Sequence, residues 1–439
     1  MCRKIIRNII FIGFLIQIVF GLVWMGCNIV YKQDFAEPSA GIYAGTVRLL
    51  GGAYPAMYVL QLFAAGCAGW RLVFRLCFHG ENKDQDKKKS MLFALWGSLA
   101  LMTLPTAMQC HLALLPHSFV CSAGLLQLSF CCDLLEPGRR EILDFAPFVG
   151  LWVCYFAQAL LLPEYIFLGA VPVAVMLLLK RRGIAQAKMQ LKIFLLLAVA
   201  AAGIFAVCSR SVKTETENDA FVENDISGIE WTLVKRLCWP TLWVDYEGMP
   251  ENIKEATADA VWESAFYPGN MDRVFKPAIE AAMSADEAKP LLAEAAAGSW
   301  RMHYPMIVRQ VGWDVLGYCA SPIILQMQLS GDAYESHSGR NYEIMRRNAP
   351  VLTRRYVNYG SWWFAAAAVL TMCLLAARLA AGERPYAVRE GRLSVVVFSF
   401  AAFCIFWYTI QGAGIMDYKY TIFINELWFL WSLRTMHAR

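Results

Sequence analysis

The chain has 439 residues, of which 58% are hydrophobic, and its mean hydropathy is positive at +0.42. Its apolar residues form long uninterrupted blocks, and this composition excludes an ordinary soluble domain. The net charge of +5 comes from basic residues that flank these blocks, so it does not indicate a nucleic-acid-binding protein.

The apolar blocks are long enough to cross a membrane as helices, which takes about 18 to 25 residues for roughly 30 Å of hydrocarbon. We therefore predict an all-α fold, a polytopic transmembrane bundle of about ten spans with a helical extracytoplasmic domain. In chain order, the predicted spans cover about 8–29, 52–75, 91–110, 117–135, 144–162, 164–180, 191–208, 359–381, 393–412 and 419–433.

The orientation of the bundle is predicted from its short loops, because cytoplasmic loops carry an excess of lysine and arginine. Such residues precede the first span and follow the even-numbered spans, as in Arg3, Lys4, Arg7, Arg71, Arg75, Lys87, Arg139, Arg140, Lys180 and Arg434. This pattern predicts a multi-pass protein of the cell membrane with both termini in the cytoplasm. The long segment 209–357 is then extracytoplasmic.

Three domains follow from this topology. Residues 1–208 form a seven-span membrane bundle, 209–357 an extracytoplasmic helical domain, and 358–439 a three-span membrane unit. Within 209–357, helical patterns cover 250–262, then 277–297 with a break near Pro290, then 300–327 with an interruption around 319–322.

The extracytoplasmic segment is rich in aromatic residues, for which two interpretations stay open. They either line a cleft for sugar rings or lipid, or pack the core of the domain and hold it at the headgroup layer. The residues concerned are Trp231, Trp239, Trp243, Tyr246, Trp262, Tyr267, Trp300, Tyr304 and Trp313.

Most of the 14 cysteines fall within predicted spans, where a thiol acts as a small apolar group. Cys238 and Cys319 lie inside the extracytoplasmic segment, and the sequence leaves open whether they form a disulfide. The chain has no glycine-rich phosphate loop, no HExxH motif and no cysteine–histidine zinc spacing, which argues against ATP-driven transport and metalloprotease activity.

The first extracytoplasmic loop contains Asp34, Glu37 and Tyr43, followed by Arg48 and by Tyr54-Pro55 at the start of the second span. In these residues, and in its layout of many spans with one large external segment, the chain resembles the GT-C superfamily of membrane glycosyltransferases. The resemblance in motifs covers about 30 residues at the outer face. Many members of the family have adjacent acids, whereas Asp34 and Glu37 are three positions apart.

The resemblance implies transfer of a sugar from a polyprenyl-phosphate donor to an acceptor outside the cytoplasm. Asp34 would be the catalytic base, with Glu37 as its alternative, and Arg48, Arg354 and Arg355 would bind the donor phosphate. A divalent cation is a further candidate for stabilising that phosphate, although the sequence names no metal ligands. The same acids are also consistent with solvated loop residues, and the arginines with contacts to membrane lipid headgroups.

Five other polar residues carry weaker functional interpretations. His111 and His117 are candidates for proton transfer, and Glu164 is a candidate metal ligand. Glu426 is a functional candidate because burying a carboxylate within a membrane span costs free energy. Asp314 either faces a membrane site or forms hydrogen bonds within its domain.

Two other functions compete with sugar transfer. A transporter or flippase of a lipid-linked precursor predicts paired charges deep in several spans. A non-catalytic membrane protein with an external binding domain predicts that the outer acids can be replaced without consequence. The sequence does not fix the sugar, the acceptor or the oligomeric state.

Overall fold

The computed structural model describes residues 54–78, 116–135, 145–162, 165–179, 229–266, 270–319 and 389–412, together with scattered positions that include 43, 111 and 226. Every regular element within these residues is a helix, and none of them lies in a strand. The prediction of an all-α fold is therefore confirmed for this part of the chain.

The chain divides into two compact units. The first comprises Met1–Ser209, Ser321–Phe403 and Asp417–Arg439, and the second comprises Arg210–Ala320 and Cys404–Met416. The helix α20 (Arg389–Gly412) crosses the boundary, so its last turns belong to the second unit. There, Tyr318 Oη donates a hydrogen bond to the Tyr408 carbonyl oxygen at 3.4 Å.

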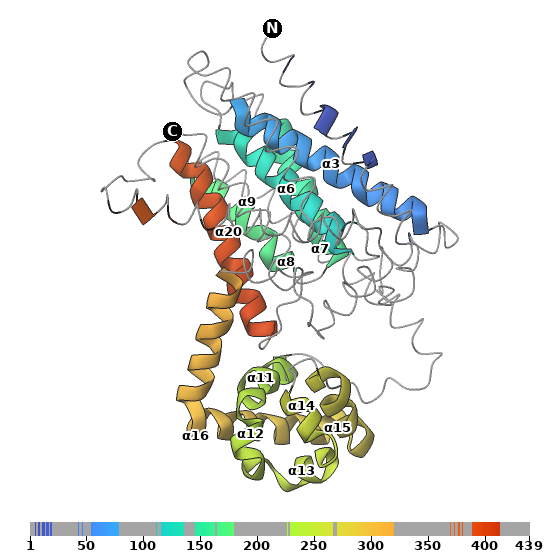
Figure 1. Cartoon of the computed structure of the whole chain (residues 1–439), viewed down its shortest axis with the longest axis vertical. Helices are drawn as coiled ribbons and strands as arrows, with labels where there is room; N and C mark the ends of the chain where they lie inside the picture. The colour runs from blue at the N-terminus through green and yellow to red at the C-terminus, as the bar shows by residue number, and fades with distance from the viewer. Residues whose placement is uncertain are drawn as a thin grey trace. The chain divides into compact units, whose positions relative to one another are not determined.

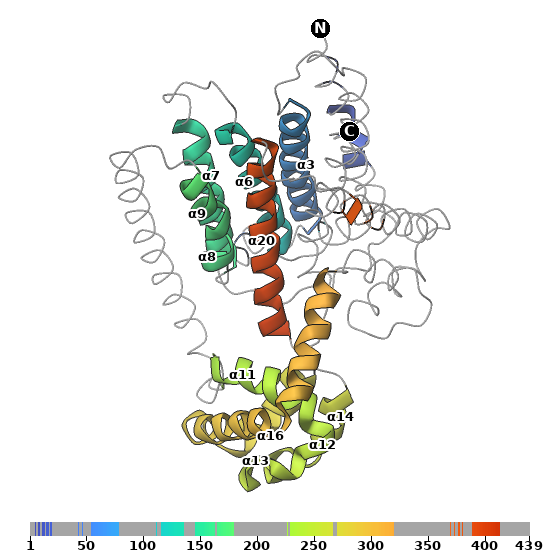
Figure 2. The same cartoon turned by 90° about the vertical axis from the view of Figure 1, so that its left-hand side faces the viewer.

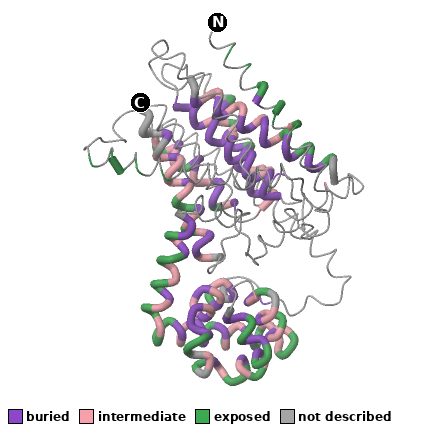
Figure 3. The backbone as a smooth tube through the Cα atoms, in the orientation of Figure 1, coloured by how far each residue is buried: buried purple, intermediate pink, exposed green. Residues whose placement is uncertain are grey.

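In the first unit, four predicted spans correspond to described helices. These are α3 (Tyr54–Phe78), α6 (His117–Leu135), α7 (Phe145–Leu161) and the pair α8 (Tyr165–Leu168) and α9 (Ala170–Leu179). Helix α6 packs against both α3 and α7 (Figure 1). Because it has neighbours on two sides, most of its side chains are buried (Figure 3).

Two described helices, Ala56–Leu76 and His117–Leu135, are long and apolar enough to cross a membrane. Three shorter apolar helices, Ala146–Leu161, Tyr165–Leu179 and Val395–Ile410, accompany them. The predicted spans 8–29, 91–110, 191–208, 359–381 and 419–433 lie largely outside the described residues. The number of spans and their orientation therefore remain predictions.

The predicted span 164–180 is interrupted at Gly169, between α8 and α9. A Cβ atom at Gly169 would lie 2.6 Å from Gln158 Oε1 and 2.8 Å from the Tyr165 carbonyl oxygen, so a larger residue does not fit. Gln127 Nε2 donates a hydrogen bond to the Gly169 carbonyl oxygen at 3.1 Å. A side chain of α6 thus satisfies a backbone group at the interruption, as a bilayer would require.

The second unit is built from short helices followed by one long helix (Figure 2). In chain order these are α11 (Ile229–Cys238), η3 (Trp239–Thr241), α12 (Leu242–Asp245), η4 (Tyr246–Gly248), α13 (Glu251–Thr257), α14 (Val261–Phe266), η5 (Met271–Phe275), α15 (Lys276–Ala282) and α16 (Ala285–Cys319). The core is formed by buried apolar side chains from these helices, among them Trp231, Val234, Leu242, Ile253, Met271, Phe275, Ile279 and Leu292.

Cys238 is one of the core residues and is a free thiol in the structure. Its sulfur accepts a hydrogen bond from Ser299 Oγ at 3.6 Å, and its carbonyl oxygen accepts one from Thr241 Oγ1 at 2.9 Å. Burial raises the pKa of this thiol to about 12. The disulfide that the sequence left open is therefore absent at Cys238.

The start of α16 corrects one prediction. The break expected near Pro290 lies instead at Met283, which has an extended backbone with φ −149° and ψ 160°. Ser284 and Glu287 then form a reciprocal capping arrangement, in which the Glu287 carboxylate accepts from the Ser284 backbone N–H at 3.1 Å and from its Oγ at 2.9 Å. This cap decides where α16 begins, and Pro290 lies inside the helix.

Helix α16 bends at His303, whose φ of −127° and ψ of 23° are not helical. Pro305 follows two residues later and lacks the backbone N–H that would continue the ladder of hydrogen bonds. Figures 1 and 2 both show the change of direction within α16. The described part of α16 runs to Cys319, and the predicted interruption around 319–322 lies largely outside the described residues.

Candidate functional site

The residues assigned by the family resemblance lie outside the described part of the chain. They are Asp34, Glu37, Arg48, Arg354 and Arg355, and the same holds for Glu164 and Glu426. Candidate sites within the described residues come from two other features, exposed aromatic rings in the second unit and a charged cluster in the first.

Five of the aromatic side chains described within 229–319 are exposed, although this part of the second unit has a well-packed core. They are Trp243, Trp262, Trp300, Tyr304 and Trp313, with exposed fractions of 47%, 65%, 46%, 57% and 63%. Trp231, in contrast, is buried in the core and donates from Nε1 to Asp272 Oδ1 at 2.6 Å. Packing in the core is therefore confirmed for Trp231, whereas the roles of the exposed rings in a cleft or at the headgroup layer stay predictions.

Trp243 and Trp262 form a pair, here called the tryptophan pair. Their ring centroids lie 5.7 Å apart at an angle of 67°. Trp243 Nε1 donates to the Ala265 carbonyl oxygen at 2.9 Å, which fixes the orientation of its ring. An exposed ring held in one orientation is suited to contact a flat apolar surface, such as a face of a sugar ring.

Beyond its bend, α16 carries a second group of exposed apolar side chains. Tyr304, Val308 and Leu316 are exposed and recur at helical spacing, with exposed Trp313 beside Leu316. Exposed apolar faces of this kind mark contact surfaces, and the mixture of tyrosine, tryptophan and aliphatic residues is typical of the boundary between a membrane and water.

Asp314 lies on the opposite, buried side of the same helical segment. Its carboxylate forms an ion pair with Arg236 of α11, and both side chains are 8% exposed. Gln310 Nε2 donates to the other carboxylate oxygen at 2.9 Å. Asp314 therefore forms hydrogen bonds within its domain, which confirms one of the two interpretations open at that residue.

His111 and His117 are both buried, at 2% and 8% exposed. The Nδ1 atom of His111 lies 2.8 Å from Ser118 Oγ, and its carbonyl oxygen accepts from Gln61 Nε2 at 2.7 Å. Tyr43 Oη donates to Gln61 Oε1 at 2.8 Å. These contacts make His111 part of a buried polar network, whereas its role in proton transfer remains a prediction.

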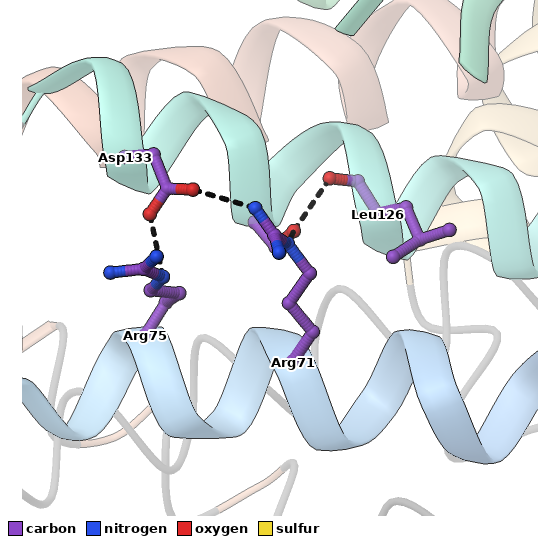
Figure 4. Close-up of polar contacts among 5 residues, drawn as sticks. Arg71, Arg75, Leu126 and Asp133 are labelled. Carbon is purple, nitrogen blue, oxygen red and sulfur yellow. Dashed lines mark hydrogen bonds and ion pairs between the residues drawn. The ribbon is translucent and has the colours of Figure 1, made fainter. Parts of the chain in front are cut away.

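The charged cluster of the first unit joins α3 to α6 and consists of Arg71, Arg75 and Asp133 (Figure 4). Arg71 Nη2 lies 2.7 Å from Asp133 Oδ2, and Arg75 Nε lies 2.6 Å from Asp133 Oδ1. The Asp133 side chain is 1% exposed, whereas the two arginine side chains are 32% and 33% exposed. Two guanidinium groups thus share one buried carboxylate.

Arg71 is held by two further contacts. Its Nε donates to Ser129 Oγ at 2.9 Å, and its guanidinium carbon lies 4.3 Å from the centroid of the Phe130 ring. The Phe130 ring in turn fits against Gly150 of α7, where a Cβ atom would lie 2.4 Å from a ring carbon. Packing of α6 on α7 therefore fixes the ring that supports Arg71.

The sequence pattern does not reveal this cluster by itself. The distribution of basic residues predicts that Arg71 and Arg75 follow the second span, but both lie within α3, which continues to Phe78. Asp133 stands within an apolar run, as Glu426 does. The rule that an acidic residue in a span is costly would have identified it.

A group of three or more histidine, cysteine, aspartate or glutamate side chains that could hold a metal ion is absent from the described residues. The divalent cation implied by the family resemblance has no ligand set in that part of the chain. Comparisons with protein-family models, curated proteins and solved structures gave no match.

Proposed function

We propose that this chain is a multi-pass membrane protein that transfers a sugar from a polyprenyl-phosphate donor to an acceptor outside the cytoplasm. The proposal rests on the resemblance of the first outer loop to the GT-C superfamily. Among the described residues, the tryptophan pair is the observation that supports it best, because two fixed and exposed indole rings suit a carbohydrate.

In the proposed reaction, Asp34 accepts the proton of an acceptor hydroxyl as its oxygen attacks the anomeric carbon of the sugar. The bond between that carbon and the phosphate oxygen breaks, and the polyprenyl phosphate leaves with the bonding electrons. Arg48, Arg354 and Arg355 stabilise the negative charge of the departing phosphate. Attack from the face opposite the phosphate inverts the configuration of the anomeric carbon.

The tryptophan pair has a separate role in this proposal, which is to bind the acceptor glycan. The rings lie on a folded helical unit within the segment that is predicted to be extracytoplasmic. Their apolar faces cover the C–H groups of a sugar while its hydroxyl groups stay in water.

Membranes that contain the chain test the proposal, with a panel of labelled polyprenyl-phosphate hexoses as donors. Asp34→Asn keeps the size of the side chain and removes the base, so transfer should be lost while the amount of folded protein is unchanged. Full transfer by this variant would contradict the assigned base, and transfer from none of the donors by the wild type would contradict sugar transfer itself.

The acceptor role is tested separately by Trp243→Ala and Trp262→Ala, which should raise the acceptor KM about two- to tenfold. Trp300→Ala is the matched control, since Trp300 is 46% exposed and Trp243 is 47% exposed. An equal effect of all three variants would show that the tryptophan pair has no special part in binding the acceptor.

A second function is translocation of a lipid-linked precursor, and the cluster of Arg71, Arg75 and Asp133 favours it. Translocation predicts paired charges deep in several spans, and this cluster joins charged groups of two membrane-capable helices, although it lies near the ends of both. Proteoliposomes with a fluorescent polyprenyl-phosphate analogue separate the two functions. Movement of the analogue between leaflets without any transfer of sugar would support translocation.

A further inference from the structure

The charged cluster between α3 and α6 has more positive than negative charge. Arg71 and Arg75 face a single carboxylate, that of Asp133, among the described residues. One arginine is enough to neutralise Asp133. A second guanidinium in an apolar helix carries a desolvation cost unless another anion compensates it.

The two arginines differ in how they are held. Arg71 contacts Asp133, Ser129 and the ring of Phe130. Among the described residues, Arg75 contacts Asp133 through Nε, and one nitrogen of its guanidinium group points away from that carboxylate (Figure 4). The N–H groups of Arg75 that do not face Asp133 are therefore available as donors to a ligand, and its side chain is 33% exposed.

The cluster lies at the end of both helices. Arg75 is close to Phe78, where α3 ends, and Asp133 is close to Leu135, where α6 ends. At this end of a helix the exposed carbonyl groups favour cations. If α3 and α6 cross a membrane as proposed above, this end is at the level of the phosphate groups of one leaflet, and the lysine and arginine pattern places it on the cytoplasmic side.

We infer that Arg75, together with Arg71, binds the phosphate group of an anionic lipid at the cytoplasmic headgroup layer. Arginine binds phosphate through parallel N–H donors, and basic pockets between membrane helices are suited to such headgroups. Asp133 orients both guanidinium groups, while Phe130 and Ser129 keep Arg71 in place. This inference rests on the proposed membrane location but not on sugar transfer.

The inference is tested with the purified full chain in detergent, by measuring the retention of phosphatidylglycerol by native mass spectrometry. Phosphatidylcholine and inorganic phosphate are the comparison ligands. Arg75→Gln should lower the retention of phosphatidylglycerol about five- to tenfold. Arg309→Gln is the matched control, because Arg309 is an exposed arginine of α16, and it should leave the retention unchanged.

Asp133→Asn distinguishes a lipid site from a purely structural ion cluster. The substitution removes the negative charge that opposes the lipid phosphate but keeps a carbonyl oxygen that can accept from the guanidinium groups, so the variant should retain at least as much phosphatidylglycerol as the wild type although its α3–α6 contact is weaker. A purely structural cluster predicts that Arg75→Gln and Asp133→Asn both lower the melting temperature and that neither changes lipid retention.

Two results would overturn the inference. One is equal retention of phosphatidylglycerol by Arg75→Gln and the wild type. The other is retention of inorganic phosphate that equals the retention of phosphatidylglycerol, which would identify a site for free phosphate. Neither result depends on sugar transfer, so failure here and failure of the proposed function are separate outcomes.

Discussion

The two units contain arginine–aspartate contacts of different design. In the second unit, Arg236 and Asp314 form a one-to-one pair in which both side chains are 8% exposed, and Gln310 binds the remaining carboxylate oxygen. In the first unit, two arginines share Asp133, and both are about one-third exposed, at 32% and 33%. The first contact has no net charge and is buried, and we call it the closed pair. The second has one positive charge in excess and partly exposed arginines, and we call it the open cluster.

The difference indicates separate roles. The Arg236–Asp314 pair is buried on both sides, so a ligand from water does not reach it, and its function is to join α11 to α16 at a defined position. An open cluster with excess positive charge retains hydrogen-bond donors and can recruit an anion. The balance of charge and the exposure of the arginines thus distinguish a structural contact from a candidate binding site.

The largest expected effect is on the closed pair. Asp314→Ala leaves Arg236 buried without its partner, and breaking a buried pair in this way costs about 3 to 5 kcal/mol of the free energy of unfolding. Hydrogen exchange of the full chain, followed on peptides from 229–300, should show the loss of protection.

The control for this prediction removes both charges. The double variant Arg236→Met with Asp314→Leu replaces the pair with apolar side chains and should exchange at nearly the wild-type rate. If Asp314→Ala exchanged as slowly as the double variant, Arg236 would not be an uncompensated buried charge, and the contrast between the two units would fail.

A smaller effect is expected at the open cluster. Asp133→Asn should destabilise the α3–α6 contact by about 1 to 3 kcal/mol, because a hydrogen bond to a charged group is lost while the exposed arginines can turn to other partners. Hydrogen exchange should rise in 117–135 and stay unchanged in 285–319. A loss of stability as large as that in Asp314→Ala would show that Arg71 and Arg75 have no access to other partners when the chain is in the membrane.

The sequence predicts helices well where the pattern of apolar residues dominates. Predicted spans 52–75 and 117–135 match α3 and α6 to within a few residues. The prediction of helix boundaries fails where a local side-chain contact outweighs the preference of a single residue type. Pro290 indicates a helix break, yet capping by Ser284 and Glu287 starts α16 earlier and keeps Pro290 inside.

Side-chain pairing could not be predicted in the same way. Arg71 and Asp133 are 62 residues apart, and only the packing of α3 on α6 brings them together. Residue type also does not separate Trp231, which is buried in the core, from Trp243, which is exposed. The catalytic assignment of Asp34 comes from a family resemblance at residues outside the described part, so it stays a prediction.

The contribution of Cys238 to the pH dependence of stability tests whether water reaches the interior of the second unit. Its thiol has a pKa of about 12 in the folded chain and 9.0 as its reference value, so above about pH 9 the unfolded chain loses this proton first. Stability should therefore fall with rising pH, by about 1.4 kcal/mol at pH 10 relative to pH 8. Cys238→Ala lacks this thiol, and the difference between wild type and variant isolates its contribution.

The result for Cys238 bears directly on the comparison of the two units. If the wild type and Cys238→Ala lose stability in parallel up to pH 10, water reaches the thiol in the folded chain. The interior that holds Arg236 and Asp314 would then be more open than the structure indicates.

The smallest effect is expected for an exposed carboxylate, that of Glu287 at the start of α16. Hydrogen bonds from the Ser284 backbone N–H and Oγ hold the pKa of Glu287 below its usual value. The carboxylate stabilises the fold at pH values above its unfolded pKa, and this contribution is lost as the pH falls through its folded pKa.

Glu287→Gln should therefore lower stability slightly at pH 7 and leave it unchanged near pH 3, as judged from urea unfolding curves at the two pH values. Glu294→Gln is the control, since Glu294 is also an exposed glutamate of α16 but lies beyond its first turn. An equal loss in both variants would assign the effect to the net charge of the helix. A loss of stability in Glu287→Gln alone assigns the effect to the helix cap. The Glu287 carboxylate also accepts from two donors, but it contributes less to the free energy of unfolding than Asp314 because water surrounds it.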